Sequence, residues 1–357
     1  MTTPASTKED TPQNVVIHAF SSPGQAPDVR LNALGINEFH VHSFLLKHHS
    51  AFFRKFLDSP DKQQGDNPRN AEELTAVKMR AGKVTKFRYE WVTQFDEVGR
   101  GWHLVAASNM QSDNPSPYTY TQRRFQAELF RELLCAIYNR PYEIYAPRQL
   151  ISLVEMADYY CMLPTLSSTL DGVLHKSKRY IAPLLDVEAL QLLPVAAKVR
   201  NELLFRECLL FVLGPYDEPR FTQLDDPKLE DVAELAFTKL FARIGQSRKK
   251  LWDLAIFDDT IIDQVASNDK VQALSSCAKM ALSPEGRGVQ FPAYYRALLD
   301  VQLSDTYPFR ESLASLTRCD LELVGNIQAG VGDYSRHFFC GFLLESDLPW
   351  DPTETDW

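Results

Sequence analysis

The chain has 357 residues, of which 45% are hydrophobic and 24% charged, a composition typical of globular proteins that bury a core and can form two domains. Its net charge is -9, from 38 basic and 47 acidic residues, and a surplus of this sign repels a phosphate backbone. We interpret the two short basic runs, Lys176–Arg179 and Arg243–Lys250, as solvated helix ends. The composition therefore argues against direct binding to nucleic acid.

The six cysteines lie far apart, without C-x-x-C spacing, and most of them fall within apolar runs. A buried thiol behaves as a small hydrophobic group, so we expect reduced core residues. The N-terminal residues lack the apolar core of a secretory signal, and no run reaches the roughly 18 apolar residues of a membrane helix. We expect an intracellular protein without membrane contact, and both the cytosol and the nucleus stay open.

The N-terminal part of the chain predicts strands. Residues 1–13 are polar and rich in Pro and Thr, which is typical of a disordered tail. Val15–Phe20 is rich in β-branched residues and predicts a short strand. Asp28–His42 alternates apolar and polar residues around Gly35 and predicts a hairpin.

Two helical segments are expected between Ser43 and Leu57. The second presents a wide aromatic and aliphatic stripe, too apolar for an exposed helix, formed by Phe52, Phe53, Phe56 and Leu57. We expect the phenylalanines to be buried by two helices that follow later, around Leu129–Tyr138 and Leu150–Leu163.

A second hairpin is predicted after a polar loop at 60–70. Its strands, Lys86–Gln94 and Gly101–Ser108, flank a Gly-containing reversal, and a polar stretch at 109–122 follows. The aromatic residues of this hairpin either pack on the domain or form an exposed contact surface; they are Phe87, Tyr89, Trp91, Phe95 and Trp102.

The remaining chain is predicted to be helical. Phe125–Tyr138 and Arg148–Leu163 have helical apolar spacing, the second helix is expected to stop at Pro164, and another helix follows. From about Ile181 onward only amphipathic helices are expected, without a repeat period. The fold class is therefore α+β: an N-terminal unit with a small mixed sheet, an all-α unit at 180–348 and a tail at 349–357.

Four histidines, His40, His42, His48 and His49, fall within ten positions and raise the question of a metal site. Adjacent helical residues diverge by about 100°, so His48 and His49 would face different directions. A zinc site needs three or four convergent ligands, commonly including Cys or carboxylates, and residues 39–57 contain neither. No nucleophile, phosphate-binding or dinucleotide motif accompanies the histidines. We therefore predict no metal, no cofactor, no catalytic residues and no small-molecule ligand.

Three motifs in order carry a resemblance to a known family. The first has the pattern F-x-V-H-x-x-x-L-x-x-x-S-x-x-F and resembles the signature of BTB/POZ domains. The second, Leu129–Ile144, is similar to an apolar helix of that family that ends in a tyrosine. The third, Leu150–Leu166, is similar to the helix that follows it. The matching residues are Phe39, Val41, His42, Leu46, Ser50, Phe52 and Phe53 in the first motif, Tyr138 in the second, and Ala157 and Asp158 in the third.

The resemblance implies a BTB/POZ domain over residues 14–178, with the second hairpin as part of an insertion at about 60–122. It makes His42 a structural residue, hydrogen-bonded where a strand enters a helix. The chain departs from the pattern at Ser43, where the family usually has Lys or Arg. The helical region at 180–348 resembles the C-terminal region of uncharacterised fungal BTB proteins. In that region Lys198, Arg200, Asn201 and Arg206 either line one polar edge or form a solvated face.

BTB/POZ domains are interaction modules that often form homodimers or adapt substrates to cullin-type ubiquitin ligases. The resemblance therefore implies an adaptor or scaffold whose partners are proteins: a second copy, a cullin, or both. Val15, Val16 and Ile17 are a possible dimer strand that would add to a partner's sheet, although pairing within the chain is an equal alternative. Two other functions stay open: a nuclear transcriptional co-regulator without its own DNA-binding element, and an enzyme whose dispersed site uses His42 or His103.

Overall fold

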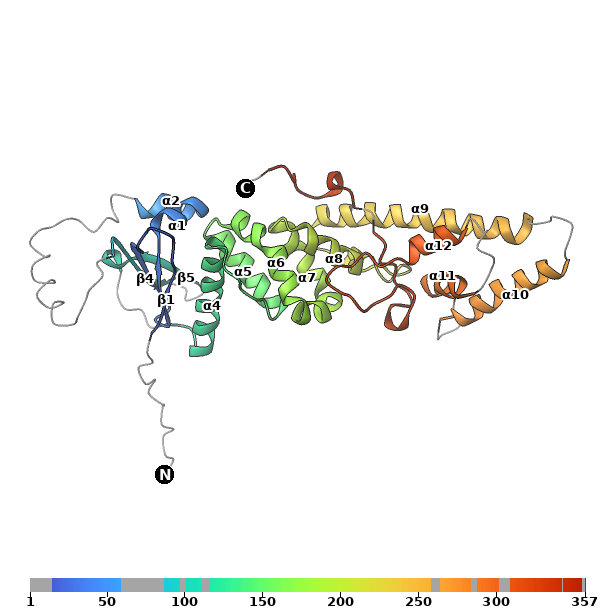
Figure 1. Cartoon of the computed structure of the whole chain (residues 1–357), viewed down its shortest axis with the longest axis horizontal. Coiled ribbons are helices and arrows are strands. Elements are labelled where there is room, and N and C mark those ends of the chain that lie inside the picture. The colour runs from blue at the N-terminus through green and yellow to red at the C-terminus, as the bar shows by residue number, and fades with distance from the viewer. Residues whose placement is uncertain are drawn as a thin grey trace, which may run out of the picture. The chain divides into compact units, whose positions relative to one another are not determined.

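The computed structural model describes residues 15–58, 87–96, 101–110, 116–257, 264–283, 288–301, 309–341, 343–354 and 357. The predictions for residues 1–13 and for the loop at 60–70 lie outside these ranges. The chain divides into two compact units, the first formed by residues 1–142 and 152–166, the second by 143–151 and 167–357. Figure 1 follows the chain through both. The fold is α+β, with a five-stranded mixed sheet and helices followed by a mostly helical region.

The sheet of the first unit contains both predicted hairpins. Its strands, in spatial order, are β1 (Val16–Ala19), β3 (Asn37–Val41), β2 (Val29–Ala33), β4 (Tyr89–Phe95) and β5 (Trp102–Ala106). The pairs β2–β3 and β4–β5 are antiparallel, whereas β1–β3 and β2–β4 are parallel. Gly35 has a φ of 66° in the tight turn between β2 and β3, a conformation that glycine adopts without steric cost.

The second hairpin belongs to this sheet, because β4 pairs with β2 in a register that places Trp91 opposite Leu31. Tyr89 and Trp91 are buried. Trp102 lies edge-on to Phe130, with ring centroids 5.9 Å apart. Of the two expectations for its aromatic residues, packing on the domain is therefore the one observed.

Capping side chains mark where two of the first three described helices begin. The three helices are α1 (Ser43–His49), α2 (Ala51–Leu57) and α4 (Tyr120–Ile137), and the two with a capping side chain are α2 and α4. Ser50 caps α2 by accepting the Phe53 N–H at 3.1 Å. Thr119 and Gln122 form a reciprocal capping box, so α4 begins inside the stretch that was predicted to be polar loop up to residue 122.

The next helix ends earlier than predicted. α5 spans Pro147–Tyr159, and Cys161, with a φ of 51°, reverses the chain so that the Met162 N–H reaches the Ala157 carbonyl at 2.7 Å. Pro164 does not stop this helix. It lies in the first turn of α6 (Leu163–Ile181), where a missing N–H costs nothing.

The second unit is mostly, not entirely, helical. After the remainder of α6 its helices are α7 (Leu185–Lys198), α8 (Glu202–Val212), α9 (Pro227–Phe257), α10 (Gln264–Met280), α11 (Phe291–Asp300) and α12 (Phe309–Thr317). The expectation of an all-α region fails after Thr317. There the described residues form turns, the 3-10 segments Gly332–Tyr334 and Glu345–Asp347, and a bridge between Cys319 and Phe339. Glycines at 330 and 332 with positive φ angles turn the chain too sharply for a helix.

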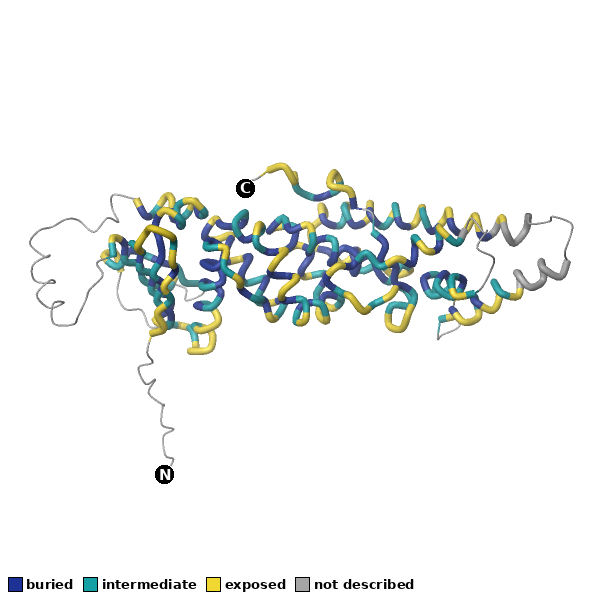
Figure 2. The backbone as a smooth tube through the Cα atoms, viewed as in Figure 1, coloured by how far each residue is buried: buried dark blue, intermediate teal, exposed yellow. Residues whose placement is uncertain are grey.

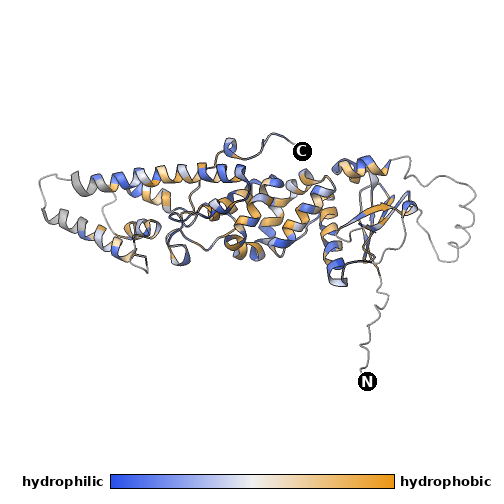
Figure 3. Cartoon of the chain, turned by 180° about the vertical axis from the view of Figure 1, so that it is seen from behind, coloured by the Kyte–Doolittle hydropathy of each residue, from blue (hydrophilic) through white to orange (hydrophobic). Residues whose placement is uncertain are grey.

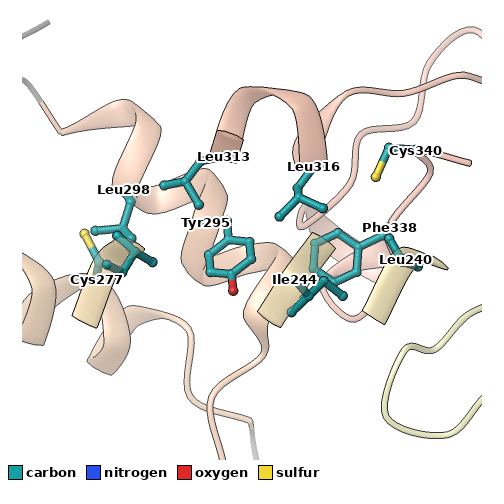
Figure 4. Packing of buried hydrophobic residues seen from close by; sticks show 10 residues of the cluster. Leu240, Ile244, Cys277, Tyr295, Leu298, Leu313, Leu316, Phe338 and Cys340 are labelled. Carbon is teal, nitrogen blue, oxygen red and sulfur yellow. The ribbon is translucent and has the colours of Figure 1, made fainter. Parts of the chain in front are cut away.

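One hydrophobic core of this unit gathers side chains from four helices and the C-terminal turns. Figure 4 shows Tyr295 of α11 among apolar residues of α9, α10 and α12, with Phe338 and Cys340 from the later segment. Leu240 and Ile244 lie on the buried stripe of α9, which is seen along part of this helix in Figure 2. The basic run Arg243–Lys250 was predicted to be a helix end, but it lies within α9.

Hydrophobic residues are concentrated in α7 and α8 (Figure 3). By length and composition alone, one stretch of the described residues, Leu163–Lys198, is long and apolar enough to cross a membrane, contrary to the prediction that no run reaches this length. A 3-10 turn at Ala182–Leu184 separates its two helices, and α7 buries Leu185, Ala189, Leu192, Leu193 and Ala196 in the core.

All six cysteines are free thiols, and four are buried. Cys161 is exposed and Cys319 is half-buried, so the expectation of core positions fails for these two. Cys161 is exposed because it occupies the reversal between α5 and α6.

Candidate protein-interaction surface

His42 joins the strand–helix junction to the end of α4. It is 1% exposed and precedes α1. Its backbone N–H donates to the Tyr138 hydroxyl at 2.8 Å, its Nδ1 lies 2.7 Å from that hydroxyl, and its Nε2 lies 3.3 Å from the Gln25 carbonyl. Because the hydroxyl accepts from the backbone, it can donate to Nδ1, which places the imidazole proton on Nε2 toward Gln25. Burial raises the pKa of Tyr138 to about 12.

The other histidines of the cluster have separate partners. His40 Nε2 lies 2.7 Å from Glu38 Oε1, and His49 Nδ1 lies 3.2 Å from the Thr165 hydroxyl. Burial, and then the neighbouring His48, lower the pKa of His49. In the part of the chain that the structure describes, no group of three or more His, Cys, Asp or Glu side chains could hold a metal ion.

His103, one of the two histidines named for the alternative enzymatic site with an acidic partner, lies on β5. Its Nδ1 is 3.0 Å from Asp96 Oδ1 across the β4–β5 hairpin, and both side chains are substantially exposed. His42 is engaged by Tyr138 instead. His103 therefore has an acidic neighbour, whereas the hydrogen-bond partners of His42 are the Tyr138 hydroxyl and the Gln25 carbonyl.

Most of the motif residues form the interior of the first unit. Ser50 is fully buried and donates to the Tyr160 carbonyl at 2.7 Å, in addition to capping α2. Tyr138 is half-buried and Asp158 is exposed. The remaining fully buried motif residues are Phe39, Val41, Leu46, Phe53 and Ala157.

The expected burial of the phenylalanine stripe is correct only for Phe53. Its ring stacks on Tyr160, with centroids 5.6 Å apart and planes 5° apart, and meets Trp91 at 6.0 Å. Phe52 and Phe56 are half-buried, with ring centroids 4.8 Å apart. Phe52 also contacts Trp91 at 6.3 Å and Tyr160 at 5.1 Å. Tyr160 belongs to the segment Leu150–Leu163 that was expected to cover the phenylalanines, whereas Trp91, in the second hairpin, was not expected as a partner.

The possible dimer strand forms an exposed edge. β1 pairs with β3 of its own chain, and on its other side the described residues contribute no strand. Val15, Val16 and Ile17, here called the β1 edge, are 40%, 51% and 61% exposed. Phe44, in the first turn of α1, is 44% exposed. Large apolar side chains on an edge strand are a typical site of protein association.

The predicted polar edge of the second unit consists of separately paired residues. Asn201 is buried, caps α8 by accepting the Leu204 N–H at 2.9 Å and donates to Asp171 at 2.6 Å. Arg206 pairs with Glu202 at 2.6 Å. The Arg200 guanidinium is engaged by Glu354, 2.8 Å away.

A shallow cleft of about 300 Å³ lies at the β2–β4 end of the sheet. Three polar groups of its lining residues bond one another, because Thr93 Oγ1 accepts the Leu34 N–H at 2.7 Å and donates to the Asn32 carbonyl at 3.1 Å. The cleft therefore gives no specific indication of a ligand.

Comparisons with protein-family models, with curated proteins and with solved structures return no match. Function is therefore inferred from the residues of this chain.

Proposed function

We propose that this chain is an adaptor or scaffold whose first unit is a BTB/POZ-type domain, and that it associates with a second copy through the β1 edge. The observation that carries the proposal is the exposure of three consecutive apolar residues at an edge strand whose outer side pairs with no strand of the described residues. Residues 15–20 contain no Lys, Glu, Asp or Pro, the residues that usually protect edge strands from association.

A second copy is the partner that best fits this edge. A strand that meets its own copy across a twofold axis offers each protomer the backbone donors and acceptors that the other lacks. The same contact would cover the apolar side chains of both copies and so remove them from water.

The BTB/POZ assignment is supported by the way its motif residues are used. His42 and Tyr138, from two of the three motifs, share hydrogen bonds, and Ser50 of the first motif donates to the backbone of Tyr160 in the third. Recruitment of a cullin-type ligase is implied by the resemblance alone. It is tested by pull-down of purified cullins with the full chain.

Substitution at the β1 edge tests self-association. Ile17→Lys places a charge at the centre of the proposed contact, and in the single chain this lysine would lie beside Glu38, the residue paired with position 17. Val187→Lys is the matched control, because Val187 of α7 is even more exposed, at 72%. We expect sedimentation velocity to show dimer association weakened about 100-fold or more by Ile17→Lys, since each dimer would bury two lysine charges.

The control variant should keep the wild-type dimer constant. Equal behaviour of the two variants would exclude the β1 edge as the contact. Wild-type chain that sediments as a monomer throughout would exclude self-association itself.

A further inference from the structure

The C-terminal segment Trp350–Trp357, here called the tail segment, is bound by the turn between α7 and α8. Arg200 lies in this turn with a φ of 51°. Its Nη1 donates to Glu354 Oε2 at 2.8 Å, and its guanidinium lies 4.4 Å from the ring centroid of Trp357. One arginine therefore binds both a carboxylate and an aromatic face, two interactions that a planar guanidinium makes at once.

A second contact holds the other end of the tail segment. The Trp350 ring lies edge-on to Phe205 of α8, with centroids 5.2 Å apart and planes 87° apart. Between the two tryptophans, Asp351 accepts the Thr353 N–H at 2.8 Å and the Thr353 hydroxyl at 2.7 Å. This turn shapes the segment by itself, as in peptides that bind in a preorganised form.

The contact has the character of a bound peptide more than of a core element. The described residues of the tail segment contain no helix or strand, and Glu354 is 48% exposed in its ion pair. Ion pairs and cation–π contacts of this exposure are weak individually, and attachment to the chain compensates for that through a high effective concentration. The buried Trp357 indole N–H has no acceptor among the described residues, so the fit leaves one donor unused.

We propose that Arg200 and Phe205 form a peptide-binding surface that the tail segment occupies within the chain. The external ligand that fits this surface is an acidic segment of a partner protein, with a tryptophan three residues after a carboxylate. The partner's segment binds when it displaces the tail segment. This surface lies in the second unit and goes beyond the proposed self-association, because it does not use the β1 edge.

The test uses the full chain with the tail contacts removed, Trp350→Ala/Glu354→Ala/Trp357→Ala, here called the released variant. The probe is a fluorescein-labelled peptide with the sequence of residues 349–357, and binding is followed by anisotropy. We expect the released variant to bind at least about tenfold more tightly than the wild-type chain, whose own tail segment competes at millimolar effective concentration.

Two further substitutions in the released variant identify the surface. Arg200→Ala should weaken peptide binding about tenfold or more, because the carboxylate and indole lose their common partner. Arg206→Ala is the matched control, since Arg206 is paired with Glu202 on the same helix, and it should change nothing. Failure of the released variant to bind, or equal effects of the two arginine substitutions, would overturn the proposal.

A second measurement does not depend on the released variant. In the otherwise wild-type chain, Arg200→Ala should increase hydrogen exchange and protease cleavage within the tail segment, whereas Arg206→Ala should not. An unchanged tail segment in Arg200→Ala would show that Arg200 does not hold it.

Discussion

Removal of the Tyr138 hydroxyl tests the contact that joins the first two motifs. In Tyr138→Phe, the buried His42 loses the partner of its backbone N–H, at 2.8 Å, and of its Nδ1, at 2.7 Å. A buried polar group that loses its partner costs about 1–3 kcal/mol, and the two groups share one hydroxyl, so we expect about 2–4 kcal/mol of local stability to be lost. The phenylalanine ring keeps the packing with Phe20, 4.6 Å away.

Hydrogen exchange measured by mass spectrometry isolates this effect in a chain with two units. Peptides that cover β2 and β3 should exchange about 30- to 1,000-fold faster in Tyr138→Phe under conditions where exchange follows the opening equilibrium. Tyr120→Phe removes a hydroxyl from the exposed first turn of the same helix and serves as the matched control. A change below about threefold in Tyr138→Phe would refute the claim that this hydroxyl anchors His42.

The same contact predicts a pH dependence. Burial favours the neutral phenol and raises the pKa of Tyr138 from 10.0 to about 12, so this group contributes stability that is complete below pH 10 and lost as the pH rises toward 12. The stability difference between wild type and Tyr138→Phe should therefore shrink over this interval. A constant difference would contradict the assigned role of the hydroxyl.

Two further substitutions probe the second unit. Burial raises the pKa of Glu207 above 4.5, so its contribution to stability is complete below that pH and is lost as the pH rises through the raised value. The free energy of unfolding, measured by urea titration from pH 4 to 8, should therefore fall less steeply with pH in Glu207→Gln than in wild type. An unchanged pH dependence would contradict burial of this carboxyl as its cause. Gly330→Ala should cost about 2 kcal/mol or more in the same assay, because Gly330 has a φ of 80° and a Cβ would collide with the Pro292 carbonyl. Gly332→Ala is the matched control, because Gly332 also has a positive φ, 58°, but an added Cβ would meet nothing within 4 Å. An equal loss of stability in the two variants would show that backbone strain, and not the collision with Pro292, causes it.

Local patterns were sufficient for most elements of the first unit. Alternation of apolar residues and the turn at Gly35 predicted the β2–β3 hairpin, because both signals lie within a few neighbouring residues. Helix ends were less predictable where single side chains decide them. The Thr119–Gln122 capping box and the reversal at Cys161 moved the ends of α4 and α5.

Contacts between distant residues could not be read from local patterns. Sequence reasoning expected a hydroxyl or backbone partner for His42, but its pairing with Tyr138, 96 positions away, requires the fold. The strand pairing of β1 was left open for the same reason, since its residues fit either β3 or a second copy. The ion pair of Arg200 with Glu354 spans 154 positions and gave no signal in either local segment.

The solution mass of the full chain tests the central claim most directly. Multi-angle light scattering after size exclusion, over a dilution series, should give twice the 40.7 kDa of one chain at high concentration and approach one chain on dilution. A mass of one chain at every concentration would contradict self-association through the β1 edge.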